Sequence, residues 1–347
     1  MASASTFLLL ALAAFQLLCT GATAFDYPPL VKGLSWTFYK SSCPKAESIV
    51  RNYLKTAIKR DVGLAAGLLR IHFHDCFVQG CDGSVLLDGT DGEKFAPPNL
   101  SLRQSGFNAI NDIRNLLQKE CGRVVSCADI AALAARDSVF LVGGPDYKVP
   151  TGRRDGLTFA SRATTLDFLP PPSSNATSLI KALDKLKLDT NDLVALSGGH
   201  TIGIGHCPSF TDRLYPTQDP VMDKTFANNL KRTCPERNTD NETVLDIRSP
   251  NVFDNKYYLD LMNRQGLFTS DQTLHTDSRT KDLVISFAID QSLFFEKFVY
   301  SMTKMGMLNV LTGSQGEIRA NCSIRNPSRA DEALSTLVDG DGEAAAF

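Results

Sequence analysis

The sequence predicts a mostly α-helical protein. Apolar residues recur at the spacing of one helix face in many segments, as they do between Cys43 and Arg60. Residues 128–135 form an Ala-rich run, Ala-Asp-Ile-Ala-Ala-Leu-Ala-Ala, which is typical of a buried helix. Few segments alternate as strands do, and no internal repeat is present.

The same spacing predicts ten helices in order along the chain. They cover residues 43–60, 64–76, 107–120, 127–141, 176–186, 190–198, 224–234, 255–264, 280–289 and 291–305. Residues 80–99 are rich in Asp, Gly and Pro and predict a loop, and 150–169 predict turns and short strands. Thr190, Asn191 and Asp192 are cap signals for the helix that they begin.

The two ends of the chain differ from the rest. An apolar run over Phe7–Cys19 ends in Ala22-Thr23-Ala24, the pattern of a secretory signal peptide over residues 1–24. One large domain follows over 25–325. Residues 326–347 form an acidic, Ala- and Gly-rich extension, either a frayed end or a removed sorting signal. With a net charge of −2, nothing favours nucleic acid or an acidic membrane as partner.

Cysteine usage agrees with secretion. Of nine Cys, one lies in the signal and eight remain, an even number that predicts four disulfides with 105 possible connectivities. Zinc ligation is less favoured, because no Cys-x-x-Cys pair is present. Four glycosylation sequons begin at Asn99, Asn175, Asn241 and Asn321.

Two stretches carry candidate chemistry. In residues 68–84, Arg70 and His74 share one helix face with Phe73 beside them, an arrangement suited to moving a proton and stabilising negative charge. His72 points elsewhere and is interpreted as a core histidine. In residues 196–203 two glycines precede His200. Two histidine sites on apolar helices suggest a flat cofactor between them, for which haem is the natural candidate.

These stretches resemble the plant secretory peroxidases, the class III haem peroxidases. The resemblance rests on Leu69–Cys76 and Asp192–Gly203, and extends from about Ser35 to Cys322. It implies a haem peroxidase fold, with one haem b between a distal and a proximal helical half. His200 would be the axial iron ligand with Asp271 as its carboxylate partner.

The resemblance also implies roles on the distal side. His74 would be the acid/base, Arg70 the group that polarises peroxide, and Phe73 the wall over the haem. Asn99 would bond His74, with Glu93 supporting it, so the Asn99 sequon is expected to be buried and unglycosylated. Pro170 would meet an aromatic donor, although a role as a helix breaker is the stronger explanation for this residue.

Disulfides and metal sites follow from the resemblance as well. The implied pairs are Cys43–Cys121, Cys76–Cys81, Cys127–Cys322 and Cys207–Cys234. Two Ca²⁺ sites are implied, and their oxygen donors suit a hard cation. The first would use Asp75, Val78, Gly80, Asp82 and Ser84; the second would use Thr201, Asp246, Ser249, Val252 and Asp254.

Three departures from the family pattern stand out. Ser249 replaces a frequent Thr, Tyr147 stands where many members have Trp, and the loop from Asn99 to Phe107 has one extra residue, with Gln104-Ser105 after Arg103. The distal network and the rim of the haem pocket could therefore be altered.

The resemblance implies a monomeric enzyme that reduces hydrogen peroxide to water while oxidising phenolic donors in one-electron steps. The alternatives are a catalytically weak haem-binding homologue and a secreted, disulfide-rich cell-wall binding protein. A zinc or non-haem iron hydrolase using His72, His74 and Asp75 is a third, disfavoured because neighbouring helical residues point apart. The extracellular space, the cell wall and the vacuole all remain open as destinations.

Overall fold

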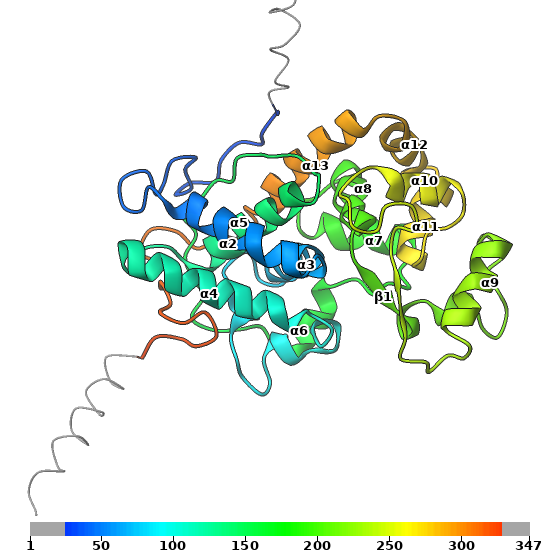
Figure 1. The fold of residues 1–347 in the computed structure, drawn as a ribbon, viewed down its shortest axis with the longest axis horizontal. Coiled ribbons are helices and arrows are strands. Elements are labelled where there is room, and N and C mark those ends of the chain that lie inside the picture. Colours follow the sequence, from blue (N-terminus) through cyan, green and yellow to red (C-terminus); the bar gives the residue numbers. More distant parts are fainter. Residues whose placement is uncertain (1–24, 328–347) are drawn as a thin grey trace, which may run out of the picture.

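The computed structural model describes residues 25–327 and confirms the mostly α-helical class. Twelve α-helices, short 3₁₀ turns and one small hairpin make up this part of the chain (Figure 1). The predicted signal peptide and residues 328–347 of the extension lie outside the described residues. No helix within 25–327 is both long enough and apolar enough to cross a bilayer.

Four helices of the N-terminal half pack together on one side of the molecule (Figure 1). They are α2 (Ala46–Arg60), α3 (Gly63–Phe77), α4 (Gln104–Cys121) and α5 (Cys127–Leu141). Helix α5 is buried along nearly its whole length, and both α2 and α3 pack against it. Its alanines let the neighbouring backbones come close, as expected from the Ala-rich run.

Between α3 and α4 the chain makes short turns, and one further helix follows α5. The turns are η1 (Ser84–Leu86), η2 (Glu93–Phe95) and η3 (Pro97–Asn99). The prediction of turns and short strands over 150–169 was partly wrong, because α6 (Arg162–Phe168) lies there. Ser161 caps this helix by accepting a hydrogen bond from the Thr164 amide at 3.1 Å, a local signal that propensity alone underrates.

The C-terminal half holds the remaining elements. They are α7 (Ala176–Asp184), α8 (Thr190–Ser197), η4 (Gly198–Thr201), β1 (Ile204–His206), η5 (Cys207–Ser209), η6 (Thr211–Arg213), α9 (Lys224–Thr233), β2 (Glu242–Val244), α10 (Lys256–Met262), α11 (Thr269–Thr276), α12 (Lys281–Ile289) and α13 (Gln291–Met305). The hairpin and α11 were not predicted. Both are short and polar, so their pairing and packing partners, rather than their own periodicity, define them.

Helix α8 is fixed at its N-terminus. The predicted cap signals were one residue late, because Asp189 is the N-cap and forms a capping box with Asp192. Asp192 also accepts hydrogen bonds from Ser301 and Lys304 of α13. This end of α8 is therefore anchored before the chain reaches His200.

A buried ion pair joins the two halves. Arg153 and Asp129 are almost fully buried, with Nη1 and Oδ1 2.7 Å apart. Arg153 Nε also donates to the carbonyl of Gly306, which directly follows α13. The pair therefore links α5 to the C-terminal end of α13.

Four disulfides lie within the described residues, and they are the four pairs that the resemblance implies. They join Cys43–Cys121, Cys76–Cys81, Cys127–Cys322 and Cys207–Cys234. The third closes the longest span, since its cysteines are 195 residues apart in sequence.

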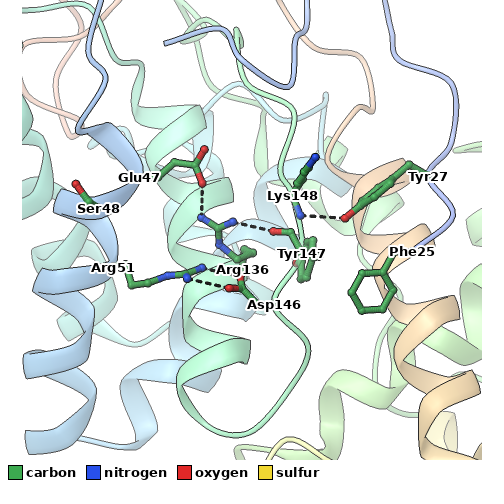
Figure 2. Close-up of a pocket in the computed structure, with 9 residues that line it drawn as sticks. All are labelled: Phe25, Tyr27, Glu47, Ser48, Arg51, Arg136, Asp146, Tyr147 and Lys148. Atoms are coloured by element: carbon green, nitrogen blue, oxygen red, sulfur yellow. Dashed lines mark hydrogen bonds and ion pairs between the residues drawn. The ribbon is translucent and has the colours of Figure 1, made fainter. Parts of the chain in front are cut away.

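A surface pocket of about 790 Å³ lies over α2, α5 and the segment after α5 (Figure 2). Four of its charged side chains pair with one another: Arg51 with Asp146, and Arg136 with Glu47. Behind them, fully buried Asp137 accepts hydrogen bonds from Arg51 Nε at 2.8 Å and Arg136 Nε at 2.7 Å. The pocket wall is thus a charge network that holds α2 against α5.

We expect Asp137→Asn to destabilise the fold by about 1–3 kcal/mol, because it removes the buried carboxylate that Arg51 and Arg136 share and leaves Arg136 with the exposed Glu47 as its remaining carboxylate partner. Denaturant unfolding of the disulfide-bonded protein measures the change. Glu296→Gln is the control, since its ion pair with Lys297 is exposed and little change is expected. Equal midpoints for the two variants would show that the network contributes nothing.

Candidate active site

The distal side of the site is carried by α3. His74 is buried, and its Nδ1 is hydrogen-bonded to the side-chain oxygen of Asn99. Asn99 Nδ2 donates in turn to the backbone carbonyl of Glu93 at 2.7 Å. Because Asn99 Oδ1 is an acceptor, Nδ1 carries the proton and Nε2 keeps its lone pair. Asn99 itself is buried, as expected, whereas Leu100 and Ser101 of the same sequon are exposed.

Glu93 holds this loop in place with its side chain as well. Its carboxylate accepts hydrogen bonds from Ser84 Oγ at 3.0 Å and from the Ala160 amide at 3.1 Å. Burial raises the pKa of Glu93 to about 7. The Asn99 amide is therefore attached to a segment that is itself tied to η1 and to the turn before α6.

Arg70 lies one helical turn from His74. Burial first, and then the Arg70 charge, hold the pKa of His74 well below its usual value, while the Asn99 hydrogen bond opposes this. Burial also lowers the pKa of Arg70 to about 10, so the guanidinium stays charged at neutral pH. A neutral imidazole beside a fixed cation can accept a proton while the cation stabilises negative charge.

Residues 98–101 hold the Arg70 guanidinium. Nη1 donates to the Ser101 carbonyl at 3.0 Å and to Ser101 Oγ at 3.1 Å, and Nη2 donates to the Pro98 carbonyl at 2.9 Å. The sequence pattern marked Ser101 only as part of the Asn99 glycosylation sequon. Phe73 is half-buried, with its ring edge-on to His74 at a centroid separation of 4.8 Å.

The proximal side is built around His200 on η4. Its Nδ1 lies 2.7 Å from Asp271 Oδ1, which also accepts a hydrogen bond from the Tyr257 hydroxyl at 3.0 Å. The Phe268 amide donates to Asp271 Oδ2 at 2.9 Å. Tyr257 was not predicted, although it lies within the range over which the resemblance extends.

The two sides face each other. A Cβ on Gly199 would lie 3.4 Å from Leu69 Cδ2 of α3, so the turn that carries His200 sits against the helix that carries His74. Gly198 is required for another reason, because a Cβ there would lie 2.3 Å from the Tyr258 hydroxyl. The glycines thus permit close packing on both faces of this turn.

The proximal donor set fits a haem iron. The His200 side chain is 40% exposed while Asp271 is 3% exposed, and within residues 25–327 no hydrogen bond involves His200 Nε2. A carboxylate on one ring nitrogen and a free second nitrogen is the usual arrangement of a metal-ligating histidine.

The residues of the first expected calcium site converge beside His74. Asp75 is fully buried; its Oδ2 accepts from the Gly83 amide at 3.0 Å, and its Oδ1 has no hydrogen-bond partner among residues 25–327. Burial raises the pKa of both Asp75 and Asp82. Ser84 Oγ donates to Glu93, which leaves its lone pairs available. Val78 and Gly80 lie on the loop between, also buried.

The residues of the second site converge beside His200. Thr201 Oγ1 donates to Asp246 Oδ2 at 2.9 Å, and Ser249 Oγ donates to Asp254 Oδ2 at 2.8 Å. Both carboxylates are buried, and the Val252 carbonyl lies 3.5 Å from Thr201 Oγ1. Ser249 supplies the hydroxyl that is expected at this position. Both oxygen-rich clusters fit a hard cation.

Two other residues singled out in the sequence, His72 and Pro170, lie as follows. His72 is buried against the Cys76 sulfur, at 3.6 Å from Nδ1, and burial together with Arg153 lowers its pKa to about 3. His72, His74 and Asp75 therefore have separate partners, and no group of three metal-ligating His, Cys, Asp or Glu side chains occurs within residues 25–327. Pro170 is half-buried just after α6.

Comparisons with known proteins agree with this geometry. The peroxidase family model matches residues 50–290. Peroxidase 12 of Arabidopsis thaliana is 64% identical over 91% of this chain and 88% of its own length. Cationic peroxidase SPC4 of Sorghum bicolor is 61% identical over 88% of this chain and 86% of its own. Peroxidase 3 of Arabidopsis thaliana is 47% identical over 86% of this chain and 94% of its own.

The family match covers both histidine segments, the loop that carries Asn99 and the carboxylate at Asp271. A similarity of this extent, together with the four disulfides and the facing histidines, makes the protein a peroxidase enzyme. The chain belongs to the peroxidase family.

Proposed function

We propose that this peroxidase binds one haem b between α3 and η4, reduces hydrogen peroxide to water and oxidises small phenolic donors in one-electron steps. The observation that carries the proposal is the pair of facing histidine sites. His74 with Arg70 lies on one side, and His200 with Asp271 lies on the other. When bound, the haem supplies the redox chemistry that no side chain of the site can supply.

The distal residues handle the proton and the charge. His74 Nε2 would take the proton from the near oxygen of peroxide and deliver it to the far oxygen, which leaves as water with the electron pair of the O–O bond. The two electrons that the near oxygen then needs would come from the haem, and the phenolic donors would replace them one at a time. Arg70 stabilises the negative charge that develops on the far oxygen while the O–O bond breaks. Asn99 keeps the imidazole in the tautomer that this transfer requires.

The proximal residues set the character of the iron ligand. His200 Nε2 would hold the iron, and the hydrogen bond to Asp271 makes the imidazole a stronger donor. Tyr257 donates to the same carboxylate oxygen and so withdraws part of its negative charge. The balance between these two hydrogen bonds tunes the electron density that reaches the metal.

Two Ca²⁺ ions complete the proposal. One binds Asp75, Val78, Gly80, Asp82 and Ser84, and the other binds Thr201, Asp246, Ser249, Val252 and Asp254. The unpartnered Oδ1 of Asp75 supports the first site, and the two buried carboxylates joined through hydroxyls support the second. One ligand of each ion directly follows a histidine of the site, Asp75 after His74 and Thr201 after His200. Loss of either ion is therefore expected to disturb the haem.

The donor and the destination complete the assignment. Pro170 is proposed to contact phenolic donors, and the mature chain of 25–325 is proposed to act as a secreted monomer. The acidic extension keeps the vacuole open as a second destination.

The weak-homologue alternative is disfavoured, because Arg70, Phe73, His74 and Asn99 are all present. The binding-protein alternative predicts no Soret band.

The function is tested by haem reconstitution. We expect the wild-type protein to show a ferric Soret band that loses intensity with one equivalent of hydrogen peroxide and recovers with guaiacol. His200→Ala should abolish this response, and Asp271→Asn should lower haem affinity or activity about 10- to 100-fold. His275→Ala is the control, since His275 shares α11 with Asp271 but takes no part in the hydrogen bonds of Asp271 or His200. A wild-type protein without a Soret band would overturn the proposal.

Calcium removal gives a second test. The apoprotein should bind two Ca²⁺ per chain by calorimetry, and ion at 100 times its Kd should add about 2.7 kcal/mol per site to the free energy of unfolding. Asp75→Asn should lower the stoichiometry to one. Asp88→Asn, on an exposed carboxylate paired with Lys94, should leave it at two. Unchanged binding in Asp75→Asn would refute the first site.

Glycan mapping gives a third test. Asn99 uses both ends of its amide within the buried network, whereas Asn175 and Asn241 are exposed. We therefore expect glycopeptide mass spectrometry of plant-expressed protein to find Asn99 unmodified. A glycan on Asn99 in active protein would contradict the distal network described above.

A further inference from the structure

The starting observation is how the catalytic arginine is held. Three oxygens from one four-residue stretch surround the Arg70 guanidinium: the carbonyls of Pro98 and Ser101 and the Ser101 hydroxyl. The hydroxyl is the only one of the three that a side-chain substitution can remove. It lies 3.1 Å from Nη1, within ordinary hydrogen-bonding distance.

The same stretch also holds the catalytic histidine, through Asn99. Its backbone is a tight turn, in which the Asn99 amide donates to the Ala96 carbonyl at 2.8 Å and the Leu102 amide donates to the Asn99 carbonyl at 3.0 Å. Asn99 and Leu102 are buried, while Leu100 between them is 66% exposed. The turn is therefore anchored at two points and presents Ser101 to Arg70.

We propose that Ser101 is a positioning residue for Arg70. Its hydroxyl fixes the orientation of the guanidinium, and with Asn99 it makes residues 98–101 the single element that aligns both distal side chains. This inference rests on the proposed function, because the alignment matters only where peroxide is cleaved. It also gives each polar residue of the Asn99-Leu100-Ser101 sequon a role in the site, since Asn99 bonds His74 and Ser101 bonds Arg70.

The test compares Ser101→Ala with Ser101→Thr, which keeps the hydroxyl. The control is Ser42→Ala, which removes an exposed hydroxyl distant in sequence from Ser101. Protein refolded from bacteria avoids any effect through glycosylation, since Ser101→Ala also destroys the sequon. Equal unfolding midpoints and equal Soret bands establish that the variants fold and bind haem alike.

Two readouts then decide. In the haem-free protein, phenylglyoxal should modify Arg70 faster in Ser101→Ala than in the wild type, as peptide mass spectrometry measures. In the haem-bound protein, the rate constant for reaction with hydrogen peroxide should fall about 3- to 10-fold, a partial loss because two carbonyls still hold the guanidinium. The rate of guaiacol oxidation in the later steps should not change. Ser101→Thr should restore both readouts.

The inference and the proposed function fail in different ways. If the wild type reacts with peroxide and Ser101→Ala matches it in both readouts, Ser101 has no positioning role and the function stands. If Ser101→Thr is as slow as Ser101→Ala, the hydroxyl is not the cause and the inference is overturned. A wild type that binds haem but ignores peroxide overturns the proposed function itself.

Discussion

The structure depends on one buried ion pair, Arg153 with Asp129. The Asp129 carboxylate also accepts hydrogen bonds from the Tyr39 hydroxyl and the Gly152 amide. Asp155, two residues after Arg153, accepts hydrogen bonds from the Ala128 amide at the start of α5 and from the Arg319 amide near the end of the described chain. Because unpaired charges are so costly at this depth, the N-terminal, central and C-terminal segments must all be in place together.

Each half of the site repeats one design. A histidine is oriented through Nδ1 by a side-chain oxygen, Asn99 on one side and Asp271 on the other, and each orienting group is held by the fold. The difference in charge between these partners assigns different chemistry to the two imidazoles. A neutral amide leaves His74 able to accept and return a proton, whereas a carboxylate makes His200 a strong electron donor.

Much of this could be predicted from sequence. Helix α5 and helix α13 have the bounds that the apolar spacing predicts, because the residue pattern of a long amphipathic or Ala-rich segment is sufficient to indicate a helix. Helix α11 and the β1–β2 hairpin could not be predicted, since their short polar sequences become ordered only through contacts distant in sequence. The roles of Asn99 and Asp271 came from the resemblance alone. Ser101 and Tyr257 were missed because a hydroxyl has no pattern that distinguishes a structural use from a solvated one.

The bond between Cys127 and Cys322 has a consequence for biosynthesis. While the chain is being made, Cys76 meets Cys81 and Cys43 meets Cys121 before Cys127 appears, but Cys127 must stay reduced until nearly all of the domain has been translated. A chain shortened anywhere before Cys322 leaves a free thiol at the N-terminus of α5, able to attack the earlier disulfides. Only a chain that includes Cys322 can therefore convert the Cys127 thiol into its native disulfide.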